Sequence, residues 1–158
     1  MSSLEIAQGF LAGIQSSPSF DQHALSGLKV TTASPGTCSC QFEAQPHVLN
    51  RYGTLHGGCI ATLVDTVTTT ALATVSQALG VSVNLAVTYM SPVPGGQPLE
   101  VKATVVRAGR QLATIECDIM SGGKLCAKGL HTKFLHQVPA PSKPAPAPPE
   151  ALEPRSKL

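Results

Sequence analysis

The residues most able to do chemistry lie close together, between Asn50 and Asp65. Gly57 and Gly58 begin a segment with helical apolar spacing, and the first N–H groups of a helix have no intrahelical partner. Such donors attract negative charge and can stabilise an oxyanion that forms on a reacting carbonyl. Asn50 and His56 can orient a carbonyl or a water molecule by hydrogen bonding. The combination indicates hydrolytic chemistry at a carbonyl group.

Asp65 is the one carboxylate of the expected helix, and it is flanked by Leu63, Val64 and Val67. A carboxylate in this setting is a candidate general base. Eight residues of helix hold it about 12 Å from Gly57, too far to reach a carbonyl bound at that helix's own N-terminus. Either one of the two residues is not catalytic, or a two-fold axis brings Gly57 of one chain to Asp65 of another. The low charged fraction, 13%, independently favours association.

Each of these residues also has an ordinary structural interpretation. Paired glycines can allow close packing at a helix start, a single histidine is usually structural, and Asp65 could be bonded to a neighbouring threonine. Their combination within sixteen residues favours the catalytic interpretation.

The surrounding pattern predicts the elements that must position this group. Apolar residues at helical spacing predict a short helix over residues 4–14, and a long helix over 56–75 that Gly80 ends as a C-cap glycine. Alternating patterns between turn residues predict a hairpin and four further strands, at 28–33, 37–42, 81–89, 99–107, 111–120 and 124–134. The short breaks between the last three strands favour antiparallel pairing. The fold class is therefore α+β, with one long helix lying on a single sheet.

Composition excludes several classes of protein. The 158 residues suit one domain, and the net charge of +2 argues against a dedicated nucleic-acid binder. There is no apolar run of about 18 residues that would span a bilayer, and the N-terminal residues do not resemble a secretory signal. The chain has an odd number of cysteines, which favours reduced thiols over disulfides: Cys38, Cys40, Cys59, Cys117 and Cys126. No metal site is predicted, because no second pair of Cys or His ligands lies near Cys38 and Cys40.

The chain changes character after residue 136. Residues 1–136 are expected to form the folded domain, and residues 137–158 a tail rich in proline and alanine. Its last three residues, Ser156, Lys157 and Leu158, match the signal that the peroxisomal import receptor reads. The sequence therefore predicts a peroxisomal location.

The run Asn50-Arg-Tyr-Gly-Thr-Leu-His-Gly-Gly-Cys-Ile-Ala-Thr-Leu-Val-Asp65 resembles the signature of the PaaI-like acyl-CoA thioesterases of the hotdog-fold superfamily. The segment 80–92 looks like the strand that follows the central helix in that fold, and the resemblance extends over about residues 27–135. It implies a long central helix wrapped by an antiparallel β-sheet, assembled as a homodimer or as a dimer of dimers. It implies no metal or other cofactor.

The resemblance also implies roles for individual residues. The Gly57 N–H would polarise the thioester carbonyl, while Asp65 of the other subunit would activate water or attack directly. Asn50 and Ser82 would position the water, and His56 would support the loop or the thioester.

The anionic part of coenzyme A requires cations, and the best local cluster is the turn at Arg107 and Arg110. In the family the region matching this turn lines the coenzyme A site, although a solvated hairpin turn would look the same in the sequence. The candidate substrate-binding residues are Tyr89, Ser91, Arg107, Gly109, Arg110, Gln111, Leu112, His131 and Lys133.

The expected reaction is hydrolysis of an acyl-CoA to a carboxylic acid and coenzyme A. A peroxisomal substrate would be a fatty acyl-CoA or an aromatic one such as 1,4-dihydroxy-2-naphthoyl-CoA. A non-hydrolytic acyl-CoA-binding protein of the same fold is the alternative, but it would need no base at Asp65. A hotdog-fold hydratase is less favoured, since such enzymes usually present an aspartate and a histidine from one helix.

Overall fold

The computed structural model describes residues 1–135, so the predicted tail and its targeting signal lie outside the described residues. The elements in chain order are the helices and strands α1 (Ser3–Gln15), α2 (Phe20–Ala24), β1 (Lys29–Ser34), β2 (Thr37–Glu43), the 3-10 turn η1 (Pro46–Val48), α3 (Gly57–Ala73), β3 (Val81–Tyr89), β4 (Pro98–Ala108), β5 (Leu112–Ser121) and β6 (Lys124–Phe134). Every predicted helix and strand is present, with ends within about two residues of those expected.

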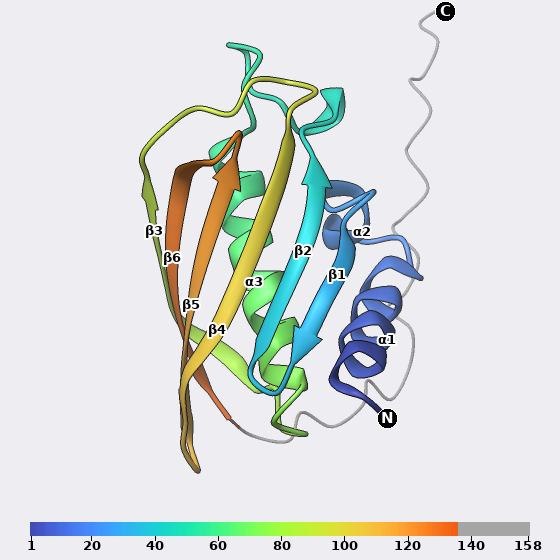
Figure 1. Cartoon of the computed structure of the whole chain (residues 1–158), viewed down its shortest axis with the longest axis vertical. Coiled ribbons are helices and arrows are strands. Elements are labelled where there is room, and N and C mark those ends of the chain that lie inside the picture. Colours follow the sequence, from blue (N-terminus) through green and yellow to red (C-terminus); the bar gives the residue numbers. More distant parts are fainter. Residues whose placement is uncertain (136–158) are drawn as a thin grey trace, which may run out of the picture.

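The six strands form one antiparallel sheet in the order β1-β2-β4-β5-β6-β3. The long helix α3 lies along one face of the curved sheet, and α1 lies beside β1 (Figure 1). Alternate residues of β4 and β5 are buried against α3, for example Val101 and Ile115. This is the hotdog arrangement, and it confirms the predicted fold class.

Burial stabilises α3 more than the helix propensity of its sequence does. Eleven of its 17 residues are buried, although β-branched residues favour helix only weakly. The hydroxyl groups of Thr68, Thr69 and Thr70 are satisfied by donating to carbonyls one turn earlier, at 2.7 to 2.8 Å. The helix lies so close to β6 that a Cβ at Gly129 would fall 2.4 Å from Val64 Cγ1. The sheet therefore sets the position of α3 tightly.

The predicted role of Gly80 as the C-cap of the long helix is wrong. The helix ends at Ala73, where Thr74 forms the C-cap and its hydroxyl donates to Ala71 O at 2.7 Å. Gly80 instead precedes β3 with a φ of 61°, and a Cβ there would lie 1.8 Å from Phe134 O. The glycine is needed for this close approach between two strand ends, and a glycine pattern alone does not separate this use from a helix cap.

β3 is an edge strand with an unusual share of exposed apolar surface. It pairs with β6 on one side only among the described residues. Val81, Val83 and Tyr89 are between 47 and 56% exposed, and Met90, which follows, is 47% exposed. No helix among residues 1–135 is both long and apolar enough to cross a membrane.

Candidate active site

The N-terminus of α3 presents a free backbone donor. His56 is the N-cap, and its Nδ1 accepts the Gly58 N–H at 2.8 Å. Within residues 1–135 no hydrogen bond engages the N–H of Gly57, the first helical residue. The Tyr89 hydroxyl donates to Gly57 O at 3.0 Å, so the tyrosine holds this end of the helix against β3. The arrangement leaves the Gly57 N–H at the positive end of the helix for an incoming oxygen.

Asn50 orders the loop that leads into α3. Its Oδ1 accepts the N–H groups of Tyr52 at 2.9 Å and Thr54 at 3.2 Å, and its Nδ2 donates to Thr54 Oγ1 at 2.8 Å. In the single chain, this amide bonds to its own loop. Its role in positioning water stays a prediction.

Asp65 lies in the middle of α3, and its side chain is 48% exposed. The helix runs without interruption from Gly57 to Ala73. The two residues are therefore about 12 Å apart along one rigid axis, as the spacing predicted. One chain does not bring these two groups to the same carbonyl.

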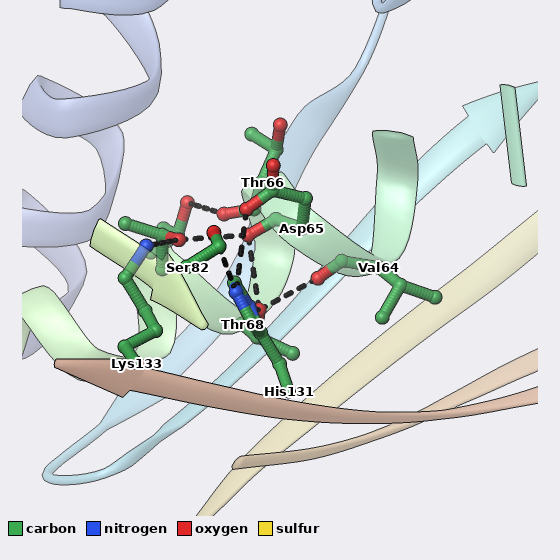
Figure 2. Close-up of polar contacts among 9 residues, drawn as sticks. Val64, Asp65, Thr66, Thr68, Ser82, His131 and Lys133 are labelled. Carbon is green, nitrogen blue, oxygen red and sulfur yellow. Dashed lines mark hydrogen bonds and ion pairs between the residues drawn. The ribbon is translucent and has the colours of Figure 1, made fainter. Parts of the chain in front are cut away.

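Thr68, His131 and Ser82 form a series of hydrogen bonds next to Asp65. Figure 2 shows Asp65, Ser82 and His131 converging from α3, β3 and β6. His131 has no exposed surface, and its Nδ1 lies 2.6 Å from Thr68 Oγ1 while its Nε2 lies 2.9 Å from Ser82 Oγ. Because the Thr68 hydroxyl donates to helix carbonyls, it accepts from Nδ1–H, and Nε2 then accepts the Ser82 hydroxyl. The oxygen of Ser82, an exposed residue, keeps its lone pairs available beside Asp65.

His131 is neutral at physiological pH. Burial lowers its pKa from the ordinary value to about 4, the nearby Lys133 ammonium acts in the same direction, and Asp65 opposes both. The Asp65 Oδ1 to His131 Nε2 distance is 3.7 Å, too long for a hydrogen bond. His131 therefore orients Ser82 and does not form a charged pair with Asp65.

Asp65 and Ser82 also line a cavity of about 280 Å³ on the α1 side of the domain. Its apolar wall includes Phe10 and Ile14 of α1, and Lys133 of β6 is part of its lining. Lys133 is 5% exposed, and its Nζ donates to Thr69 Oγ1 at 3.0 Å. Burial lowers the pKa of this lysine, and the Asp65 carboxylate opposes that shift.

The predicted substrate-binding residues do not gather at one place. Five of them lie at the β4–β5 turn and line one surface cavity of about 660 Å³: Arg107, Gly109, Arg110, Gln111 and Leu112. Thr114 and Thr132 complete the lining of this cavity. His131 and Lys133 instead lie on the opposite face of β6, toward α3 and Asp65. Tyr89 contacts Gly57, and the Ser91 N–H donates to Cys126 O.

Several site residues were not predicted from the sequence. Thr68 and Thr69 follow Asp65 by three and four residues, so they share its helix face, and that spacing was an available signal. Phe10, Ile14 and Asp21 enter the cavity from the first two helices, and nothing local in the sequence connects them with Asp65. Only the packing of α1 and α2 on α3 does so.

The cysteines contribute packing. All five are free and buried, as predicted, and the Sγ atoms of Cys38 and Cys40 lie 3.7 Å apart on one face of β2. Burial raises the pKa of the Cys117 thiol to about 12 and that of Cys59 to about 11, which keeps both protonated. No group of three metal-ligating side chains occurs in the part of the chain that the structure describes.

Comparison with known proteins finds similar sequences in one family. The sequence profile of the Thioesterase superfamily matches residues 52–127. Acyl-coenzyme A thioesterase 13 of Homo sapiens is 40% identical over 117 residues, which cover 72% of this chain and 84% of that protein. Putative esterase C31F10.02 of Schizosaccharomyces pombe is 38% identical over 73% of this chain and 74% of its own length.

Solved structures extend the likeness to three dimensions. The crystal structure of zebra fish thioesterase superfamily member 2 is similar with a TM-score of 0.80 and 38% identity, over 84% of this chain and 98% of that one. A mutant of the phenylacetic acid degradation protein PaaI from Thermus thermophilus gives a TM-score of 0.66 at 33% identity, over 72% and 96% of the two chains.

Replacement of His131 should change how stability depends on pH. Between about pH 6.5 and pH 4 the unfolded chain binds a proton at His131 that the folded chain rejects, so the free energy of unfolding should fall as the pH is lowered through this range. The full contribution is about 3 kcal/mol. The His131→Gln variant, which keeps a polar side chain but does not titrate, should lose less stability over the same interval. Urea unfolding at pH 7, 5.5 and 4.5 measures the difference, and parallel losses in both proteins would show that His131 titrates normally.

Proposed function

The chain is an acyl-CoA thioesterase of the thioesterase superfamily, and from that premise we propose how its residues hydrolyse the thioester. Asp65 takes a proton from a water molecule that Ser82 orients, and the water oxygen attacks the thioester carbon. The Gly57 N–H stabilises the oxyanion that forms. Collapse of the intermediate breaks the carbon–sulfur bond, and the coenzyme A thiolate takes the proton held by Asp65, which regenerates the carboxylate as the carboxylic acid leaves. The observation that carries this proposal is the Asp65 carboxylate beside the oriented Ser82 hydroxyl.

The separation of Gly57 and Asp65 supports a site shared by two subunits. About 12 Å of helix prevents one chain from placing both groups on one carbonyl. β3 offers an edge with exposed apolar residues next to Ser82, and pairing two such edges would bury them. We therefore propose a homodimer that contributes Gly57 from one subunit and Asp65 from the other, with a dimer of dimers as the larger assembly. Asn50 and His56 would hold the loop at the Gly57 end.

The anionic part of coenzyme A would bind at the β4–β5 turn. Arg107 and Arg110 line one cavity there, and guanidinium groups are suited to phosphate oxygens. The acyl group would be a fatty chain or an aromatic system such as 1,4-dihydroxy-2-naphthoyl.

Asp65→Asn should lower turnover by about two orders of magnitude or more while the fold persists, because an amide does not accept the proton of water. The measurement is release of free thiol from medium-chain, long-chain and aromatic acyl-CoAs, including 1,4-dihydroxy-2-naphthoyl-CoA. Asp118→Asn is the matched control, since Asp118 pairs with Lys128 on the outer face of the sheet. Near-normal turnover by the Asp65 variant would remove this carboxylate from the mechanism.

Gly57→Pro should lower turnover by about two to three orders of magnitude, because it removes the N–H that is proposed to bind the oxyanion. Proline is tolerated at the first position of a helix, and His56 already has the extended conformation (ψ 135°) that a following proline requires. Gly57→Ala is the matched control. It keeps the N–H, and its Cβ would meet the Tyr89 ring at an ordinary 3.5 Å.

The same two variants test whether the site is shared. Co-expression of Gly57→Pro and Asp65→Asn chains in equal amounts should restore about a quarter of normal activity, since half of the random pairs are mixed and each mixed pair has one intact site of two. Activity no higher than that of either variant alone would place both groups within one chain.

A peroxisomal location is also proposed, supported by the Ser156-Lys157-Leu158 sequence. A fluorescent protein fused ahead of residue 137 should enter peroxisomes, whereas the same fusion without Leu158 should stay outside. Equal distribution of both fusions by microscopy would contradict the assignment.

A further inference from the structure

Lys133 is a buried cation that the proposed hydrolysis does not use. It is 5% exposed, yet it borders the cavity that also contains Asp65 and Ser82. An ammonium group has three N–H donors, and within residues 1–135 Thr69 Oγ1 is its one hydrogen-bond acceptor. No carboxylate of the described chain lies within ion-pair distance of its Nζ. A buried and incompletely bonded ammonium is costly, so its retention requires an explanation.

The surroundings of Lys133 fit an organic group that is mostly apolar. Phe10, Ile14 and Val81 provide apolar walls to the same cavity. Two carboxylates, Asp21 and Asp65, also line it, and with Lys133 they give the lining a formal charge of −1. This balance disfavours an anionic substituent. A hydroxyl fits better, because it accepts from an ammonium and donates to a carboxylate.

The distance from the reacting carbonyl also constrains the group. Lys133 bonds to Thr69, which follows Asp65 by four residues, or about 6 Å along the helix. A thioester carbon placed beside Asp65 would therefore have the ammonium about one helical turn away, on the acyl side of the cavity. A hydroxyl at the far end of a six-carbon chain, or at the para position of an aryl ring, lies in this range.

We propose that Lys133 is a specificity-determining residue, which donates a hydrogen bond to a hydroxyl oxygen on the acyl group of the thioester. The inference rests on the proposed function, because it assigns the cavity beside Asp65 to the acyl group. It accounts for a buried lysine whose remaining donors have no acceptor within the described chain.

The test compares thioesters that differ by one oxygen. Hydrolysis of hexanoyl-CoA and 6-hydroxyhexanoyl-CoA, and of benzoyl-CoA and 4-hydroxybenzoyl-CoA, is measured as kcat/KM for the full chain. The unmodified protein should favour the hydroxylated member of at least one pair by about tenfold or more, because a site built for a hydroxyl rejects the analogue that lacks it. Lys133→Met, which keeps a long unbranched side chain, should abolish that preference.

Controls separate the possible outcomes. Lys128→Met alters the same strand on its outer face, where Lys128 pairs with Asp118, and it should leave the preference unchanged. Circular dichroism and thermal unfolding establish that the Lys133 variant is folded, and Lys133→Arg, which keeps the charge, should retain part of the preference if Lys133→Met does not fold. An equal loss on both members of a pair would show that Lys133 only supports Asp65, and this would overturn the inference.

Failure of the proposed function has a different signature. If no acyl-CoA is hydrolysed, or if Asp65→Asn retains turnover, the assignment of the site itself is wrong. If turnover depends on Asp65 but the unmodified protein does not favour the hydroxylated substrates, the inference on Lys133 alone is wrong.

Discussion

The arrangement of the proposed active site depends on the rigidity of helix α3. Gly57 and Asp65 belong to the same uninterrupted helix, which fixes the proposed oxyanion donor and the Asp65 carboxylate about 12 Å apart. A longer or more flexible connection would allow both groups to meet within one chain. Because α3 is uninterrupted between them, the two groups stay apart within one chain, so the proposed use of both at one carbonyl calls for a second subunit. The exposed apolar edge at β3 carries Ser82, so the surface that is suited to association is also part of the proposed site.

That helix is positioned by the sheet and not by its own propensity. Its threonines and valines would form a weak helix alone, and burial of Leu63, Val67 and Leu72 against the strands stabilises it. The threonines satisfy their hydroxyls within the helix, which frees that face to bind other polar groups. Thr68 and Thr69 thereby connect α3 to His131 and Lys133 of β6. The residues that lower the propensity of the helix thus also organise the site.

The fold could be predicted in outline from the sequence because its signals are local. Alternation identified β2 through Cys38, Cys40 and Phe42, and apolar spacing identified α3. The spacing of Gly57 and Asp65 was predictable for the same reason. The function of Gly80 was not, since its close contact with Phe134 O joins residues 54 positions apart. The place of Phe10 and Ile14 in the cavity was also not predictable, because these residues of α1 approach Asp65 only through tertiary packing.

Successive side chains of β6 point to opposite faces of the sheet, which explains why the roles of its lysines were difficult to predict from the sequence. Lys128 and Lys133 look alike in the chain, but five residues of a strand place them on opposite faces. Lys128 forms a solvent-exposed ion pair with Asp118, and such pairs contribute little to the stability of a fold. Lys133 is buried beside a neutral histidine, where an ammonium with one hydroxyl partner is held at a cost in free energy. The stability of the fold does not explain why a lysine is buried there. The acyl group that we propose to bind in the cavity does explain it.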